Sequence, residues 1–249
     1  MDNRILVEIC CGSAQDVITA AKAGADRAEL SSCLYFGGLT PSVGTVIAAK
    51  DGGIPIMAMV RPREGGFVYD EAEKRIMLLD AQAMVGAGAD GIVFGALTKD
   101  GKIDLDLCRR MIEAAEGRET VFHRAFDLLG NSWQRELEKL IDLGVTRVLT
   151  SGFEPTAMEG AANIAAMIRF AGGAIEILPG SGVRASNLRE LCGLTGCTQV
   201  HTSAGQQRIM DISESFSDKV SFTPDRAPAA GYGRTMREAV EQVIREARA

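Results

Sequence analysis

Long runs of one residue type are missing from this chain, and each absence excludes a class of protein. No basic cluster exceeds the pairs Lys74-Arg75 and Arg109-Arg110, and the formal net charge is −6. Nucleic acid is therefore not an expected partner. The apolar stretch at residues 5–11 is interrupted by Glu8 and is too short for a signal peptide or a membrane span. We expect a cytoplasmic protein with no membrane partner.

Paired metal-binding cysteines are also missing. None of the six cysteines stands in a C-x-x-C pair, and their density is far below that of a small secreted scaffold. We expect reduced thiols, with Cys108, Cys192 and Cys197 acting as small buried hydrophobic residues.

Eight short apolar, β-branched runs are present, and glycine or polar residues bound each of them. Most are continuously hydrophobic, as are parallel strands that are covered on both faces. The predicted strands are residues 5–11, 27–31, 54–61, 91–97, 120–125, 147–151, 174–179 and 198–203.

Helical patterns separate many of these runs. Ser13, Asp70, Asp104, Ser132 and Thr235 each precede apolar residues at helical spacing and are predicted N-caps. Four helices are then expected to end in the same way, because a glycine stands between the helical pattern and the next strand. These glycines, which suit the left-handed position after a helix, are Gly24, Gly88, Gly144 and Gly196.

Alternation of strands and helices with eight units predicts a single (β/α)8 TIM-type barrel domain over residues 1–249. An open doubly wound sheet is the alternative, but no G-x-G-x-x-G follows the first strand. Residues 206–231, which are polar and contain proline, form a predicted long irregular loop before the last helix.

Polar side chains are concentrated where the predicted strands end, which is where barrels build their sites. Residues two apart share one face of a strand, so Glu8 with Cys10, and His201 with Ser203, are expected to point into the mouth. The alternative is that the charged residues only neutralise each other in the barrel interior and that the histidines are core residues. The candidate catalytic residues, if the chain is an enzyme, are Glu8, Glu29, Arg61, His123, Asp127 and His201.

Glycine-rich loops follow the seventh and eighth predicted strands. Barrels commonly bind phosphate with backbone N–H groups of these two loops. The candidate anion-binding residues are Gly180, Ser181 and Gly182 in the first loop and Ser203, Ala204 and Gly205 in the second.

Several ordered motifs resemble the CutC family of copper homeostasis proteins. The resemblance covers about residues 5–205. The motifs are VEIC at 7–10, GADRAEL at 24–30, GGLTPS at 37–42, RPR at 61–63, DGIVFGAL at 90–97, FHRAFD at 122–127, RVLTSG at 147–152 and HTSA at 201–204.

The resemblance implies a cytoplasmic barrel that takes part in copper handling and forms a homodimer or larger homo-oligomer. It also implies Cu(I) binding by cysteines that end the first two strands. Cys10 matches the first of these, but Ser31 occupies the second position, with Cys33 two residues later. The candidate metal ligands are therefore Cys10 and Cys33, with Cys11 or a histidine as further possibilities.

Two functions remain open from the sequence. The first is Cu(I) binding at the carboxyl-end mouth of the barrel. The second is an enzyme that acts on a small phosphorylated or carboxylated metabolite, with a histidine or shielded carboxylate as general base.

Overall fold

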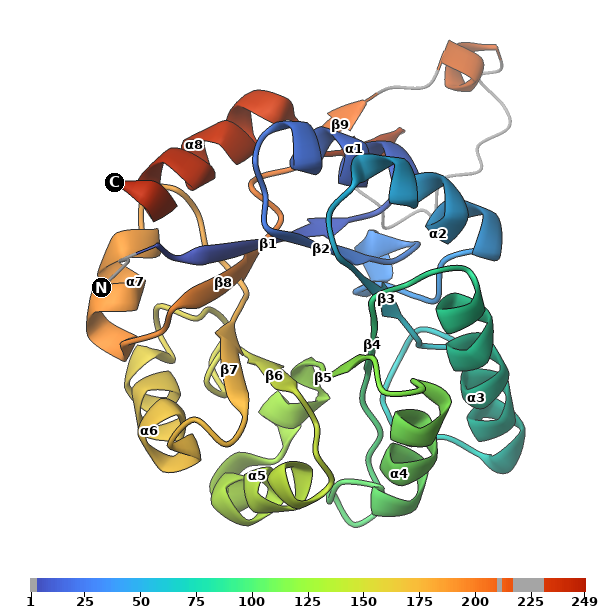
Figure 1. The fold of residues 1–249 in the computed structure, drawn as a ribbon, viewed down its shortest axis with the longest axis vertical. Coiled ribbons are helices and arrows are strands. Elements are labelled where there is room, and N and C mark those ends of the chain that lie inside the picture. Colours follow the sequence, from blue (N-terminus) through green and yellow to red (C-terminus); the bar gives the residue numbers. More distant parts are fainter. Residues whose placement is uncertain (1–3, 210–211, 217–230) are drawn as a thin grey trace.

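The computed structural model describes residues 4–209, 212–216 and 231–249, and its centre is a ring of eight parallel strands (Figure 1). The strands are hydrogen-bonded in the order β7-β6-β5-β4-β3-β2-β1-β8, and β7 lies beside β8 where the ring closes. In chain order they are β1 (Leu6–Cys11), β2 (Arg27–Leu30), β3 (Ile56–Met59), β4 (Gly91–Phe94), β5 (Glu119–Phe122), β6 (Arg147–Thr150), β7 (Glu176–Pro179) and β8 (Gln199–Thr202). The predicted barrel is confirmed, and the open doubly wound sheet is excluded.

An outer layer of helices covers the ring (Figure 1). The helices are α1 (Ala14–Lys22), α2 (Val43–Ala49), α3 (Glu71–Gly86), α4 (Leu105–Ala114), α5 (Trp133–Asp142), α6 (Ala161–Ala171), α7 (Leu188–Thr195) and α8 (Arg237–Arg248). None of the helices in the described part of the chain is both long enough and apolar enough to cross a membrane.

Local sequence signals explain most helix boundaries. The side chains of Ser13, Asp70 and Asp104 cap α1, α3 and α4 as predicted. All four predicted helix-ending glycines have φ between 75° and 95°, a conformation that a Cβ would strain. Ser132 precedes α5, but its hydroxyl donates to the Leu129 carbonyl instead of capping.

The predicted cap at Thr235 is wrong. The helix α8 begins at Arg237, after an extended Met236, and Thr235 is buried. The backbone N–H of Thr235 donates to Asp16 Oδ1 at 2.8 Å, so a contact with the start of α1 fixes this segment before the helix begins.

Side chains along each barrel strand alternate between two environments, the core between strands and helices and the inside of the ring. On β1, Val7, Ile9 and Cys11 belong to the apolar core shared with the helices, whereas Glu8 and Cys10 face the inside of the ring. The side of the ring formed by β3 to β7 is filled by a second apolar cluster. Its members are Met57, Met59, Val93, Val121, Leu149 and Leu178. Toward the carboxyl ends of the strands, the polar groups inside the ring are therefore gathered on the β8, β1 and β2 side.

The predicted irregular loop 206–231 contains a short strand, β9 (Gln207–Ile209), which pairs antiparallel with β10 (Tyr232–Arg234). The amide of Gln206 donates to the Cys10 carbonyl at 3.4 Å, which fixes the start of this segment beside the carboxyl end of β1. Residues 210–211 and 217–230 of the predicted loop lie outside the described residues.

Candidate metal centre

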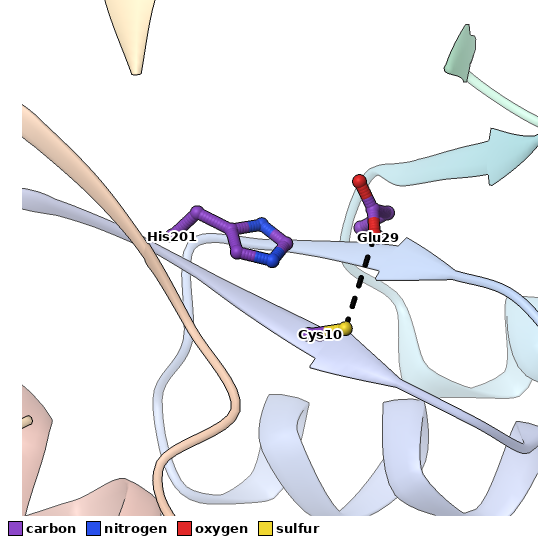
Figure 2. A group of neighbouring side chains, drawn as sticks. All are labelled: Cys10, Glu29 and His201. Carbon is purple, nitrogen blue, oxygen red and sulfur yellow. Dashed lines mark hydrogen bonds between the residues drawn. The ribbon is translucent and has the colours of Figure 1, made fainter. Parts of the chain in front are cut away.

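Three neighbouring strands bring together four of the residues that the sequence singled out. The register of β1 pairs Glu8 with His201 on β8 and Cys10 with Glu29 on β2. All four side chains face the ring interior; Cys10, Glu29 and His201 lie toward the carboxyl ends of their strands, and Glu8 lies in the middle of β1. The His201 ring points toward Cys10 and Glu29 (Figure 2). Barrel closure is what joins residues that are almost 200 positions apart in the chain.

One sulfur, one ring nitrogen and one carboxylate oxygen, from Cys10, His201 and Glu29, lie within 4.8 Å of one another. The Cys10 thiol donates to Glu29 Oε1 at 3.8 Å, and the second oxygen, Oε2, is buried without a hydrogen-bond partner. Cys10 is partly exposed, whereas Glu29 and His201 are buried. An unpartnered buried carboxylate oxygen is costly, and a bound cation would remove that cost.

Glu8 orients the imidazole of this group. Its Oε1 lies 2.8 Å from Nδ1 of His201, and its Oε2 accepts from Arg27 Nε at 2.5 Å. Because Nδ1 is engaged with Glu8, Nε2 is the nitrogen that faces Cys10 and Glu29. A carboxylate that holds the far nitrogen of a ligating histidine is a usual feature of protein metal sites.

The four groups also set each other's protonation. Burial raises the pKa of Glu8, but the hydrogen bond with His201 and the charge of Arg27 outweigh it and lower that pKa to about 2. Burial, aided by the negative Glu8, raises the pKa of Glu29 to about 7. Burial alone would lower the pKa of His201, yet Glu29, Cys10 and Glu8 together raise it well above its usual value. Burial also raises the pKa of Cys10.

These pKa shifts mean that several groups of the cluster are protonated at neutral pH. Glu8 is ionised, His201 is protonated, Cys10 is a thiol and Glu29 is close to its midpoint. A metal ion that binds sulfur, nitrogen and oxygen here replaces those protons, since ligands coordinate in their deprotonated forms. The thiolate and imidazole donors suit a soft or borderline cation such as copper or zinc.

A polar chain inside the barrel continues from Glu8 and was not found by the sequence analysis. Arg27 Nη2 donates to Gln199 Oε1 at 2.9 Å, and Gln199 donates to Glu176 at 3.0 Å. Arg147 then bridges Glu176 at 2.6 Å and Glu119 at 3.0 Å. Each of these five residues is the first residue of its strand, so together they form a polar layer at the amino ends of the strands. That shared position is the sequence signal from which the layer could have been predicted.

Arg61 is placed at the mouth in an unusual environment. Its guanidinium is buried and donates to the carbonyls of Phe36, Gly38 and Gly65 at 2.8, 3.1 and 2.7 Å. Nε is buried without a partner, and none of the ion pairs within the described ranges includes Arg61. The arginine therefore orders the loops after β2 and β3 while its charge stays uncompensated by an acid.

His123 lies near Arg61 and is not part of the Cys10 group. Its Nδ1 accepts from the Ala125 backbone N–H at 3.1 Å, and its ring packs on Phe67 with centroids 4.8 Å apart. Burial, with the nearby charge of Arg61, lowers the pKa of His123 to about 3, so the ring is neutral. The proton is then on Nε2, which is buried without a partner.

Asp127 has its carboxylate occupied by neighbouring protein groups. It accepts from the Ser151 hydroxyl at 3.0 Å, from the Ser151 backbone N–H, and from Arg124 at 2.8 Å. It also accepts from the Thr150 hydroxyl. These bonds join the turn after β5 to the end of β6.

The two glycine-rich loops lie side by side at the mouth. A Cβ built on Gly205 would stand 3.4 Å from Arg184, which follows the loop after β7. Ser181, Gly182, Ala204 and Gly205 all have positive φ. Within the described residues, the backbone N–H groups of Ser181, Gly182, Ser203 and Gly205 donate to no other protein group. Gly180 differs, because it is buried and its N–H donates to Thr150.

The other cysteines near the mouth are not brought into the group. Cys33 is exposed, with φ of 49°, in the loop after β2. Cys11 points into the helical core, where its thiol donates to the Ile9 carbonyl at 3.5 Å. Ser31 is buried on the same side of β2 as Glu29, and its hydroxyl has no partner.

Comparison with known proteins supports the family resemblance that the sequence motifs indicated. A model of the CutC family matches residues 5–206. A family protein CutC from Treponema denticola is 51% identical over 205 residues, which are 82% of this chain and 83% of that protein. The human copper homeostasis protein cutC homolog is 41% identical over 207 residues, which are 83% of this chain and 76% of that protein. A solved CutC structure from Streptococcus agalactiae has a TM-score of 0.77 at 35% identity and covers 80% of this chain and 98% of that one.

Proposed function

Because the chain belongs to the CutC family, we propose that it takes part in copper homeostasis by binding Cu(I) through Cys10, His201 and Glu29 at the carboxyl end of the barrel. The observation that carries the proposal is the approach of one sulfur, one nitrogen and one oxygen donor within 4.8 Å. Cu(I) is a soft ion, and the Cys10 thiolate is the softest donor of the set.

Each residue has a distinct role in this proposal. Cys10 anchors the ion, His201 supplies Nε2, and Glu29 adds an oxygen or receives a displaced proton. Glu8 is a positioning residue because it touches His201 and not the ion. Cys33 would join only if its loop moved inward, and Cys11 would have to leave the helical core. The proposed site therefore rests on a single thiolate.

An anaerobic Cu(I) titration against a competing chromogenic chelator tests this proposal. We expect Cys10→Ser to weaken binding by at least about 100-fold, because the strongest soft ligand is lost. Cys33→Ser is the matched control and is expected to bind as the wild type does. The proposal fails if the wild type cannot compete for copper or if Cys10→Ser binds equally well.

We also propose a cytoplasmic location, where thiols stay reduced, and a homo-oligomeric assembly. The assembly is supported by large apolar side chains on the neighbouring helices α2 and α3. These residues, between 44% and 57% exposed, are Val43, Ile47, Ile76 and Leu79. Light scattering is expected to give a mass of two or more chains for the wild type and a single chain for the double variant Ile47→Asp, Leu79→Asp. A monomeric wild type would contradict the assembly.

A second candidate function is an enzyme for a small anionic metabolite, and the environment of Arg61 favours it. A buried charge without a counter-ion is costly, and Arg61 Nε, His123 Nε2 and Ser31 Oγ are all unpartnered. A carboxylate or phosphate group would accept from these donors. Glu29, whose pKa is raised to about 7, would serve as the general acid or base.

Thermal unfolding with inorganic phosphate or malonate separates this candidate from the first. If an anion binds at Arg61, the Tm rises with either anion but not with sodium chloride of equal ionic strength, and Arg61→Gln removes the rise. If Arg61 has only a structural role, the Tm is insensitive to both anions. Cu(I) binding by Cys10 is measured separately, so one candidate can fail while the other stands.

A further inference from the structure

A pair of thiols lies at the opposite end of the barrel from the metal centre. Cys192 is near the end of α7, and Cys197 follows that helix just before β8. Their sulfur atoms are 3.4 Å apart, and both thiols are free. Both were predicted to be buried core residues, but Cys192 is partly exposed.

The helix end explains why the two sulfurs meet. Gly196 has φ of 75°, and its N–H donates to the Cys192 carbonyl at 2.8 Å. This left-handed cap turns the chain back, so the residue after the glycine packs on the residue that supplies the carbonyl. Because Gly196 fixes this turn, the sulfurs stay close without a covalent bond.

Both cysteines line a cavity of about 720 Å³ between the amino-terminal segment, α7 and α8. Arg4, Arg189 and Arg248 also line it, so cationic groups surround the two thiols. Arg189 has Glu246 as its acidic partner, and Arg4 and Arg248 share Asp26; both acids lie outside this lining. A cavity of this size admits a small molecule, and its lining favours an anionic one.

We propose that Cys192 and Cys197 form a redox-active dithiol that reacts with small anionic disulfides, of which glutathione disulfide is the model, to give a reversible disulfide across the end of α7. The reaction is independent of copper binding, because the pair lies at the amino end of β8 and His201 lies near its carboxyl end.

The exchange proceeds in two balanced steps. The Cys197 thiolate attacks one sulfur of the small disulfide, forms a mixed disulfide and releases one small thiolate. Cys192, after losing its proton to solvent, attacks the Cys197 sulfur and releases the second small thiolate. The protein pair loses two electrons and two protons, and the small disulfide gains them.

Local hydrogen bonding selects Cys197 as the first nucleophile. When Cys197 is ionised, the neighbouring Cys192 thiol can donate to its sulfur, and this hydrogen bond, working against burial, lowers the pKa of Cys197 to about 7. The same bond raises the pKa of Cys192. A thiol with a pKa near ambient pH is the most effective attacking group in exchange.

Peptide mapping tests the proposal on the whole protein. Reduced wild-type protein is incubated with glutathione disulfide, remaining thiols are alkylated, and trypsin releases residues 190–208, which contain both cysteines. We expect this peptide to lack alkyl groups and to be lighter by two hydrogen atoms. Exposed Cys33 is the internal reference for an ordinary thiol. The proposal is overturned if the 190–208 peptide stays doubly alkylated while Cys33 is modified.

Two further comparisons identify the mechanism and the substrate class. Cys192→Ser is expected to trap glutathione on Cys197, whereas Cys197→Ser is expected to react at Cys192 at least about tenfold more slowly. The preference for glutathione disulfide over cationic cystamine is expected to be at least about threefold greater at Cys197 than at Cys33 and to decrease with salt. Equal preferences at the two thiols would exclude recognition of anions by the arginines.

Discussion

Glu8 Oε1 and His201 Nδ1 lie 2.8 Å apart on adjacent strands, and this contact determines which nitrogen of the histidine faces the metal centre. The same carboxylate accepts from Arg27, so it is held from two sides. The His201 ring of the candidate metal centre is therefore positioned by a buried ion-pair network and not by its contacts with Cys10 and Glu29 alone.

Replacing this positioning carboxylate is expected to weaken metal binding without removing a ligand. In Glu8→Gln the charge that stabilises the oriented imidazole is lost, and we expect the Cu(I) affinity to fall about 10–100-fold, as for other residues that support metal ligands. Glu176→Gln is the control, because it perturbs the same polar chain without touching His201. Competition titration measures both; equal affinities of wild type and Glu8→Gln would contradict the role.

Restoring a second thiolate is expected to strengthen binding. Ser31 stands where the family resemblance places a cysteine, and it is buried on the face of β2 that carries Glu29. Ser31→Cys is expected to tighten Cu(I) binding by about tenfold or more, since a second soft donor replaces a weak one. Ser203→Cys adds an exposed thiol after β8 and serves as the control. If the two variants gain equally, the effect comes from any added thiol and not from this position.

The raised pKa of Glu29 predicts a pH-dependent stability. Its folded-state pKa is about 7 against an ordinary 4.5, so the wild type loses stability as pH rises through this window, in which the unfolded chain ionises first. Glu29→Gln removes the part of this loss that comes from Glu29 and is expected to be more stable than the wild type above pH 7, by at most on the order of 3 kcal/mol.

Denaturant unfolding at several pH values measures the difference. Glu8 does not interfere, because its pKa is lowered and its contribution is lost only as pH falls below about 4.5 toward 2. His201 does contribute: despite burial its pKa is raised, chiefly by Glu29, so it adds a loss of stability above pH 6.5 that is expected to be smaller in Glu29→Gln. A constant stability difference between pH 5 and pH 8 would show that Glu29 titrates as an exposed carboxyl does.

The His123 ring is expected to require a glycine at position 95, because it occupies the space that a side chain there would fill. A Cβ at Gly95 would lie 2.5 Å from two atoms of the His123 ring, so Gly95→Ala must displace the ring from its contact with Phe67. We expect a loss of about 1–3 kcal/mol, as for other overpacked sites. Gly86→Ala, at the end of α3 with no atom within 4 Å, is the control and is expected to be neutral or stabilising. Thermal unfolding would contradict the prediction if both variants behaved alike.

The sequence predicted the barrel well because its signals are local and repeated. Apolar runs marked all eight strands, although the ladders are shorter than predicted, as in 56–59 against 54–61. The helices α2, α6 and α7 were not delimited. The α6 and α7 N-cap residues, Gly160 and Asn187, have no side-chain cap bond, whereas Ser42 does cap α2 and was overlooked. Thr235 failed as a cap because a long-range contact with Asp16 competes with the local signal.

The grouping of side chains at the candidate metal centre was predicted only in part, for a related reason. Alternation along strands placed Glu8, Cys10, Glu29 and His201 on inner faces, and ring closure made them neighbours. Alternation gives no information about loops, so it did not show that Cys33 would be exposed. Alternation also does not predict which charged side chains pair with each other. The contact of Glu8 with Arg27 and the unpaired state of Arg61 were therefore found only in the structure.

The interior of the barrel has one further consequence. Beyond the candidate metal centre, the buried thioether and aliphatic side chains of the second apolar cluster fill the ring, and the ion pairs of Arg147 lie beyond them at the amino ends. An ion held by Cys10, as proposed, would therefore exchange with its surroundings at the carboxyl-end rim. A protein that received this ion would have to approach the same rim.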